Sequence, residues 1–265
     1  MSSACKRTFV IGLDGAMGSA MRKAQTPNID ALLAEGVVSY SAQTVVPSSS
    51  YQAWGAMFHS VSPEKHRIDG EHPCGEELAW PSYMKVIQNA RPELRVASFS
   101  CWNPINTNII ERSLNCHRVS LPDPALASAA AEYIRATPPD VFFMQFDFID
   151  AAGHSHGYGT APYLEQIERT DAEVGQVIDA IKEAGILDDS LVIVVSDHGG
   201  LDKGHGSAHP DCLTIIWGAR GPKVKRGVEL ADRISIMDTG PVILKALGLP
   251  APRGWDGRVP RGVFV

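Results

Sequence analysis

Cysteine is sparse in this sequence, and the cysteines that are present form no recognisable framework. They number five: Cys5, Cys74, Cys101, Cys116 and Cys212. The number is odd, the positions are widely scattered, and no two are spaced as Cys-x-x-Cys. A disulfide-stabilised scaffold is therefore not expected. The usage fits a reduced compartment, and we predict a cytoplasmic location.

Long basic runs and long apolar runs are also missing. No run of lysine and arginine exceeds two residues, and the formal net charge is −6. This balance does not favour binding to a nucleic-acid polymer or to an anionic membrane surface. No apolar segment approaches the roughly 18 residues that a membrane-spanning helix needs. The first residues lack the pattern of a signal peptide, so we expect none.

The sequence does contain a regular alternation of apolar strands and helices. Residues 141–148 and 191–195 are nearly continuous apolar runs, typical of strands buried on both faces of a sheet. Further strands are expected at 8–13, 37–46, 94–99 and 213–217, and helices at 27–36, 51–59, 81–89, 122–137, 161–184 and 238–247. This order predicts the α/β class, with a doubly wound, mainly parallel sheet and helices on both faces.

The organisation of the chain favours one domain. We find no internal repeat, low-complexity segment or linker, and predict a single α/β domain over residues 1–265. Residues 62–80 are polar and show no period, so a small surface excursion is expected there. Residues 153–160 are rich in glycine and histidine and are expected to form a loop.

Six acidic and imidazole side chains follow the ends of the predicted strands. They are Asp14, Asp150, His154, Asp197, His198 and His205. Taken singly, an Asp-Gly after a strand is commonly a turn, and a loop histidine is commonly solvated. The carboxyl ends of parallel strands, however, meet at one edge of a doubly wound sheet. We therefore expect these six side chains to lie close together.

Such a cluster favours metal ions over unaided acid–base chemistry. Three carboxylates close together would repel one another and raise each other's pKa unless cations neutralised them. Mixed oxygen and imidazole ligands suit Zn²⁺, or Mn²⁺, better than Mg²⁺ or Ca²⁺. Two divalent ions against three carboxylates leave about one net positive charge, which suits an anionic phosphoryl or sulfuryl group.

A nucleophile is available at a strand-to-helix junction, where Pro47 precedes Ser48, Ser49 and Ser50. A serine hydroxyl on a metal has a lowered pKa, and the amides at a helix N-terminus bind phosphate. The alternative is that the three serines only form a turn and a helix cap. The residues alone leave both possibilities open.

Several motifs, in their order along the chain, resemble a known group. They are Gly-Leu-Asp14-Gly, Pro-Ser-Ser-Ser50, Ser-Pro-Glu-Lys-His66, Asp150-Ala-Ala-Gly-His154, and Ser-Asp197-His198-Gly-Gly followed by Lys-Gly-His205-Gly. This combination is similar to the alkaline phosphatase superfamily, and within it to the nucleotide pyrophosphatase/phosphodiesterase branch. The resemblance extends from about residue 8 to residue 257.

The resemblance implies a role for each matching residue. One metal ion would be held by Asp150, His154 and His205, and the second by Asp14, Asp197 and His198. The family's nucleophile precedes the histidine that matches His66, and counting back gives Ser50. The implied mechanism is in-line attack by Ser50, a phosphoseryl enzyme and its hydrolysis. Ser48 and Ser49 remain alternatives for the nucleophile.

The sequence departs from the family pattern near Ser50. The Pro-Asn pair expected two and three residues after the nucleophile is replaced by Gln52 and Ala53. Two family glycines are replaced by Ser60 and Arg67. The phosphate pocket therefore lacks the family's asparagine, and Gln52 and Asn103 are the two candidates to replace it.

Other polar and aromatic residues have competing interpretations. His156 is expected to face solvent or to support a ligand, and His209 competes with His205 for one ligand position. Asp147 either supports a ligand histidine or caps the strand end. The candidates for stacking on a leaving group are Trp54, Trp102 and Tyr158.

The leading hypothesis is therefore a two-metal hydrolase of phosphodiester or nucleotide pyrophosphate bonds in a small phosphorylated substrate. A phosphonate hydrolase or a phosphomonoesterase would use the same site. A sulfatase is less favoured because no Cys/Ser-x-Pro-x-Arg segment is present. A non-catalytic relative that binds metal or a phosphorylated ligand is the alternative from another class.

Overall fold

The computed structural model describes residues 5–74 and 79–265. These residues form one eight-stranded sheet in the order β4-β3-β5-β1-β6-β7-β2-β8. Only β7 runs antiparallel to its neighbours β6 and β2 within this described sheet, and the remaining pairs are parallel. The strands are β1 (Arg7–Leu13), β2 (Val37–Gln43), β3 (Val96–Ser100), β4 (His117–Val119), β5 (Val141–Phe146), β6 (Ser190–Ser196), β7 (Thr214–Arg220) and β8 (Val228–Glu229). The expected mainly parallel α/β sheet is confirmed.

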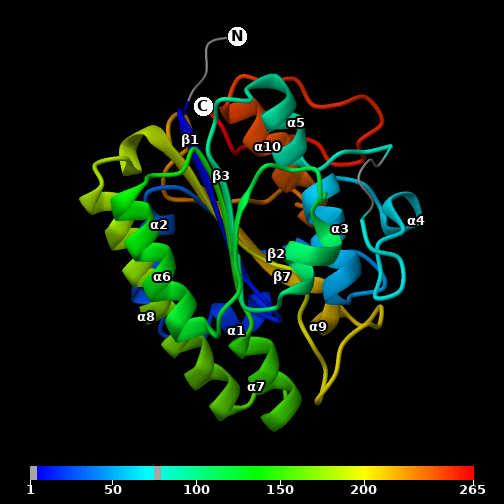
Figure 1. Ribbon diagram of the computed structural model, residues 1–265. Helices are drawn as coiled ribbons and strands as arrows, with labels where there is room; N and C mark the ends of the chain where they lie inside the picture. Colours follow the sequence, from blue (N-terminus) through cyan, green and yellow to red (C-terminus); the bar gives the residue numbers. More distant parts are fainter. Residues whose placement is uncertain (1–4, 75–78) are drawn as a thin grey trace.

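The helices cover both faces of the sheet (Figure 1). They are α1 (Gly18–Met21), α2 (Pro27–Ala34), α3 (Ser50–His59), α4 (Pro63–His66), α5 (Tyr83–Ala90), α6 (Asp123–Ala136), α7 (Phe148–His156), α8 (Ala161–Glu183), α9 (Pro210–Leu213) and α10 (Thr239–Ala246). A short π-helix, η1 (Ile105–Ile109), and two 3₁₀ helices, η2 (Leu187–Asp189) and η3 (Ile236–Asp238), complete the described elements. Apolar side chains of α2, α6 and α8 form one core layer, and those of α3, α5 and α10 form the other.

The central strands bring their carboxyl ends to one edge. β5, β1 and β6 are buried along their whole length, as their continuous apolar sequences predict. In the sheet, Leu13 lies between Phe146 and Ser196, so all three strands end at the same level. The polar residues that follow them therefore gather beyond this edge, at the bottom of Figure 1.

The structure differs from the sequence-based expectation in two segments. Residues 148–156 form helix α7, not the end of a strand followed by a loop. Its start is fixed by Asp123, whose carboxylate accepts the backbone N–H groups of Asp147 and Phe148. Within 62–80, α4 is helical, and His66 and Ile68 are buried. Residues 75–78 of that excursion lie outside the described part of the chain.

Two short strands, β4 and β8, and two short helices, α1 and α9, were not predicted. Each is four residues or fewer, too short to show a hydrophobic period. Among the described helices, none combines the length and the apolar character that a membrane-spanning segment requires.

Candidate metal centre

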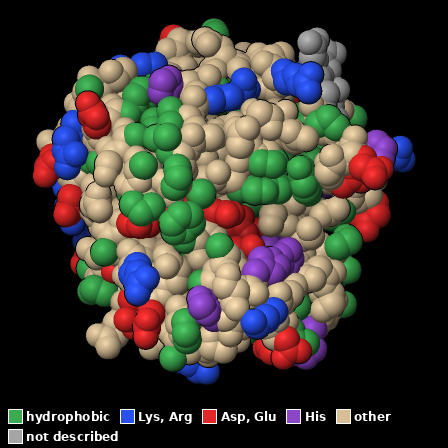
Figure 2. Space-filling view, turned by 60° about the horizontal axis from the view of Figure 1, so that its bottom comes forward, with side chains coloured by type: hydrophobic (Ala, Val, Ile, Leu, Met, Phe, Trp, Pro, Cys, Tyr) green, Lys and Arg blue, Asp and Glu red, His purple; other side chains and the backbone are tan. Residues whose placement is uncertain are grey.

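The six residues predicted from the strand ends come together in two groups of three. Asp14, Asp197 and His198 form a buried group, and Asp150, His154 and His205 form a second group nearer the surface. Within each group, the candidate ligand atoms all lie within 4.8 Å of one another. Figure 2 looks at this edge of the molecule and shows acidic and histidine side chains gathered near its centre.

The buried group lies directly beyond β1 and β6. His198 Nε2 is 3.5 Å from Asp14 Oδ1 and 3.3 Å from Asp197 Oδ2. All three side chains are at most 1% exposed. Asp197 Oδ1 accepts hydrogen bonds from the amides of Gly15 and His198, which leaves its second oxygen for another partner.

Ser50, the first residue of α3, faces this buried group. Its Oγ lies 3.2 Å from His198 Nε2 and 3.5 Å from Asp14 Oδ1. Ser49 is the N-cap residue of the helix and has extended backbone angles. Ser48 Oγ is used elsewhere, because it donates to the Ser207 carbonyl and accepts from the Gly206 amide. Of the three serines, Ser50 is the one placed beside the candidate ligands.

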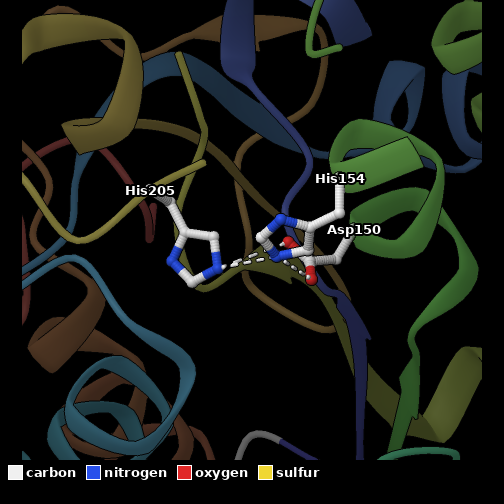
Figure 3. Close-up of side chains that lie close together, drawn as sticks. All are labelled: Asp150, His154 and His205. Atoms are coloured by element: carbon white, nitrogen blue, oxygen red, sulfur yellow. Dashed lines mark hydrogen bonds and ion pairs between the residues drawn. The ribbon is translucent and has the colours of Figure 1, made fainter. Parts of the chain in front are cut away.

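The second group joins the start of α7 to the loop after β6 (Figure 3). His154 Nε2 lies 3.2 Å from Asp150 Oδ2 and 3.2 Å from His205 Nε2. His205 Nε2 is 3.8 Å from Asp150 Oδ1. Asp150 and His154 are four residues apart on one helical turn, which is why both reach the same point.

The three histidines share one hydrogen-bonding pattern. Nδ1 of His154, His198 and His205 contacts the backbone carbonyls of Lys203, Gly199 and Ser48, at 2.8, 2.9 and 3.0 Å respectively. A carbonyl only accepts, so each Nδ1 carries a proton, and a ring in its neutral form presents a lone pair at Nε2. In the second group two such lone pairs face each other, an arrangement that a cation between them would stabilise.

Three residues outside the predicted set orient the carboxylates. Asp14 Oδ2 accepts from Trp54 Nε1 and Gln145 Nε2, each at 2.9 Å, which turns Oδ1 toward Ser50. The Tyr158 hydroxyl donates to Asp150 Oδ1. The expectation that Trp54 stacks on a leaving group is wrong, because its ring is fully buried.

Burial and mutual repulsion dominate the electrostatics. Burial raises the pKa of Asp14 well above its usual value, and the charges of Asp197 and Asp150 add to the rise. Burial likewise raises the pKa of Asp197 to about 7. Burial lowers the pKa of His198 and His205, so both rings are neutral at neutral pH. The raised pKa values mean that these carboxyls hold protons more readily than usual. A bound cation would replace those protons.

These donors fit two divalent cations. Asp197 Oδ2 is fully buried without a hydrogen-bond partner, which is costly unless a cation pairs with it. Three Nε2 atoms and three carboxylates converge without any cysteine. The two groups also touch, because the rings of His198 and His205 stack with centroids 3.9 Å apart and planes inclined by 18°.

Other candidates from the sequence lie away from these two groups. His209 is the N-cap residue of α9, where Nδ1 accepts the Asp211 amide. His156, at the end of α7, is exposed and borders a hollow near Lys203. Asp147 Oδ1 accepts a hydrogen bond from Gln145 Nε2. None of the described hydrogen bonds joins this carboxylate to a candidate ligand histidine.

The two candidates to replace the missing family asparagine, Asn103 and Gln52, form contacts away from Ser50. Asn103 is exposed, and its Oδ1 accepts from Ser120 Oγ. The Gln52 carbonyl contacts His66 Nε2, and its side-chain Oε1 is buried without a hydrogen-bond partner. Neither residue touches Ser50 through a described hydrogen bond.

Most of the chain matches one family of phosphodiester and pyrophosphate hydrolases. Residues 8–79 and 74–203 match the family described as Type I phosphodiesterase / nucleotide pyrophosphatase. These spans cover well over half of the chain, and the chain therefore belongs to this family of the alkaline phosphatase superfamily.

Solved structures share the fold at low sequence identity. Human ectonucleotide pyrophosphatase / phosphodiesterase 5 is 14% identical with a TM-score of 0.77, covering 95% of this chain and 97% of that one. An inactive form of the murine protein in complex with AMP is also 14% identical, with a TM-score of 0.75 and coverage of 93% and 96%.

Curated relatives match shorter segments. Arylsulfatase K of Danio rerio is 31% identical over 105 residues, which are 36% of this chain and 19% of that protein. The 2,3-bisphosphoglycerate-independent phosphoglycerate mutase of Onchocerca volvulus is 28% identical over 148 residues, covering 51% of this chain and 27% of the mutase. The chain thus spans about a fifth to a quarter of these relatives.

Proposed function

We propose that this protein is a two-metal hydrolase of phosphodiester or nucleotide pyrophosphate bonds and that Ser50 is its nucleophile. The observation that carries the proposal is the position of Ser50 Oγ, 3.2 Å from His198 Nε2 and 3.5 Å from Asp14 Oδ1. The family and the bound AMP of a structural relative support a small phosphorylated substrate.

The proposed ligands divide as the geometry does. Asp14, Asp197 and His198 would hold one divalent cation, and Asp150, His154 and His205 the other. We propose Zn²⁺, with Mn²⁺ as the alternative, because imidazole and carboxylate ligands are mixed without cysteine. When bound, the cations would supply positive charge that favours loss of the Ser50 proton and stabilises the phosphoryl oxygens.

The chain itself positions the nucleophile and the phosphoryl group. Ser50 Oγ loses its proton to solvent and attacks phosphorus in line, forming the Oγ–P bond as the P–O bond to the leaving group breaks. Water then attacks phosphorus, the Oγ–P bond breaks, and a proton of that water returns to Ser50 Oγ. The first amides of α3 have no acceptor within the helix, and a helix N-terminus of this kind would bind the phosphoryl oxygens. They would replace part of the binding that the missing asparagine provides in the family.

The test compares Ser50→Ala with the matched variant Ser49→Ala. With bis-p-nitrophenyl phosphate and added Zn²⁺ or Mn²⁺, Ser50→Ala should lose at least about a thousandfold in kcat. Metal content, measured by mass spectrometry, should be unchanged in both variants. Full activity of Ser50→Ala would exclude Ser50 as the nucleophile. A wild-type protein that binds metal without turnover would favour the non-catalytic alternative.

The substrate class requires a wider screen. Phosphonates and phosphomonoesters would use the same site, so both belong beside the phosphodiesters and pyrophosphates. The cytoplasmic location inferred from the cysteines remains a proposal, and fractionation of the native cells would test it.

A further inference from the structure

A hollow lined by polar side chains lies outside the two groups of candidate metal ligands. It has a volume of about 490 Å³ and is lined by Asn103, Asn106, Thr107, Arg112, Arg118 and Ser120. We call these six residues the arginine hollow. Its size is within the range of small-molecule sites, and the mechanism proposed above uses none of its residues.

The hollow is at the same edge of the sheet as the metal centre. Asn103 follows the carboxyl end of β3, and Ser120 follows that of β4. β3 pairs with β5, and the metal groups lie beyond β5, β1 and β6. Neighbouring strands lie about 4.8 Å apart, so two to three strand spacings place the hollow roughly 12 Å from the metal centre.

The charge of the hollow is positive. Neither Arg112 nor Arg118 forms an ion pair within the described residues, and no carboxylate is among the lining side chains. The chain as a whole carries a net charge of −6, so this concentration of unpaired guanidinium groups is not a general property of its surface. Guanidinium groups recognise phosphate and carboxylate groups.

A hydrogen-bond chain orients donors into the hollow. Asn106, only 6% exposed, donates from Nδ2 to Ser120 Oγ at 3.0 Å. Ser120 Oγ in turn donates to Asn103 Oδ1 at 2.8 Å. This order occupies the Asn103 carbonyl and leaves its two Nδ2 protons for another acceptor.

Arg118 is held in place from behind. Its Nη2 donates to the carbonyls of Glu111, at 2.8 Å, and Leu114, at 3.4 Å. Its Nε is buried without a hydrogen-bond partner. A guanidinium that is fixed and incompletely paired is stabilised by an anion nearby.

Trp102 connects the hollow with the catalytic serine. It precedes Asn103, and its amide donates to Gln145 Oε1 at 2.9 Å. Its ring packs edge-on against Tyr51, with centroids 4.6 Å apart, and Tyr51 directly follows Ser50. Contacts along the chain therefore run from Ser50 through Tyr51 and Trp102 to Asn103 of the arginine hollow.

We propose that the arginine hollow binds a second anionic group of the substrate, a phosphate or carboxylate roughly 12 Å from the phosphorus that Ser50 attacks. This inference rests on the proposed function, because it assigns the preferred substrate of the same site. The substrate class is then a phosphodiester or pyrophosphate with a distal anion on one of its two halves.

The kinetic test uses two p-nitrophenyl phosphodiesters with the same octyl arm, one ending in a phosphate and the other in a hydroxyl. The wild-type holoenzyme should have a KM about tenfold lower for the phosphate-ended ester. Arg112→Ala should abolish that difference and leave the kinetics of the hydroxyl-ended ester unchanged. Arg253→Ala, which removes an exposed arginine far along the chain, should behave as wild type.

A binding measurement separates this inference from the proposed function. Calorimetric titration of the metal-loaded protein with inorganic pyrophosphate should show a binding phase that Arg112→Ala removes and Arg253→Ala retains. If the wild-type protein turned over neither ester but still showed the pyrophosphate-binding phase, the proposed hydrolase function would be rejected and the anion site in the arginine hollow would stand. Equal KM values for the two esters, or an identical titration of Arg112→Ala and wild type, would overturn the anion site.

Discussion

The ring of His205 donates from Nδ1 to the backbone carbonyl of Ser48 at 3.0 Å. The Ser48 side chain holds the same loop, since its Oγ donates to the Ser207 carbonyl at 2.7 Å and accepts the Gly206 amide at 3.1 Å. The segment that carries the proposed nucleophile therefore also fixes a proposed metal ligand.

Ser48→Ala should weaken metal binding without touching a ligand. The variant loses two part-buried hydrogen bonds to Gly206 and Ser207, the residues that directly follow His205. Supporting contacts of this kind are worth about 10- to 100-fold in metal affinity. Competition with a metal chelator measures the change. Ser41→Ala, in which the replaced side chain is exposed, is the matched control. Equal affinity of Ser48→Ala and wild type would show that the loop holds its position unaided.

Tyr158→Phe tests the support of Asp150. The variant keeps the ring, which packs closely over Gly153 and Gly200, and removes the hydroxyl that donates to Asp150 Oδ1. We expect about a tenfold loss of affinity for one of two metal ions, measured by calorimetry. Tyr133→Phe, on α6, should bind both ions as wild type does. An unchanged titration for Tyr158→Phe would mean that Asp150 needs no such support.

Gln145→Leu should reduce both stability and turnover. Gln145 is fully buried, and its amide nitrogen donates to Asp14 and Asp147 while its oxygen accepts the Trp102 amide. Leaving these partners unpaired should cost about 1–3 kcal/mol in the free energy of unfolding. Urea denaturation measures this, with Gln166→Leu on α8 as the control. A stability change below about 0.5 kcal/mol would contradict the assigned contacts.

The pH dependence of stability should change sign when metal is removed. Folding raises the pKa of Asp197 from its usual value of 3.8 to about 7, and the pKa of Asp14 also rises. The folded carboxyls then bind more protons than the unfolded ones, so unfolding becomes easier as pH rises from about 4 to about 7. Chelator-treated protein should therefore melt lower at about pH 8 than at about pH 5.

With saturating Zn²⁺ the opposite trend is expected, because the cation replaces those protons and binds more tightly as pH rises. Differential scanning calorimetry on both preparations tests the pair of expectations. Parallel pH profiles with and without metal would show that Asp197 and Asp14 are not ligands.

The sequence correctly predicted those parts of the candidate site in which a charged side chain directly follows an apolar strand. Asp14 and Asp197 could be placed because their strands are buried throughout, and parallel strands share a carboxyl edge. The supporting contacts could not be predicted. Gln145 lies inside an apolar strand, and its contact with Asp14 depends on the register between β5 and β1.

Helix α7 shows why a composition-based interpretation failed. Its glycine and histidine content indicated a loop, yet Gly153 is required by packing, since a Cβ there would lie 2.6 Å from the Tyr158 ring. The carboxylate that starts the helix, Asp123, comes from a distant segment and bonds the amides of Asp147 and Phe148. Neither cause has a local signal.

The stacked rings of His198 and His205 join two metal groups through one short loop. A cation that orders His198 would also hold the ring against which His205 packs. The second ion would then meet a ligand that is already immobilised, and would lose less conformational entropy on binding. We therefore expect the two ions to bind with positive cooperativity, so that partly loaded protein is a mixture of empty and doubly occupied molecules.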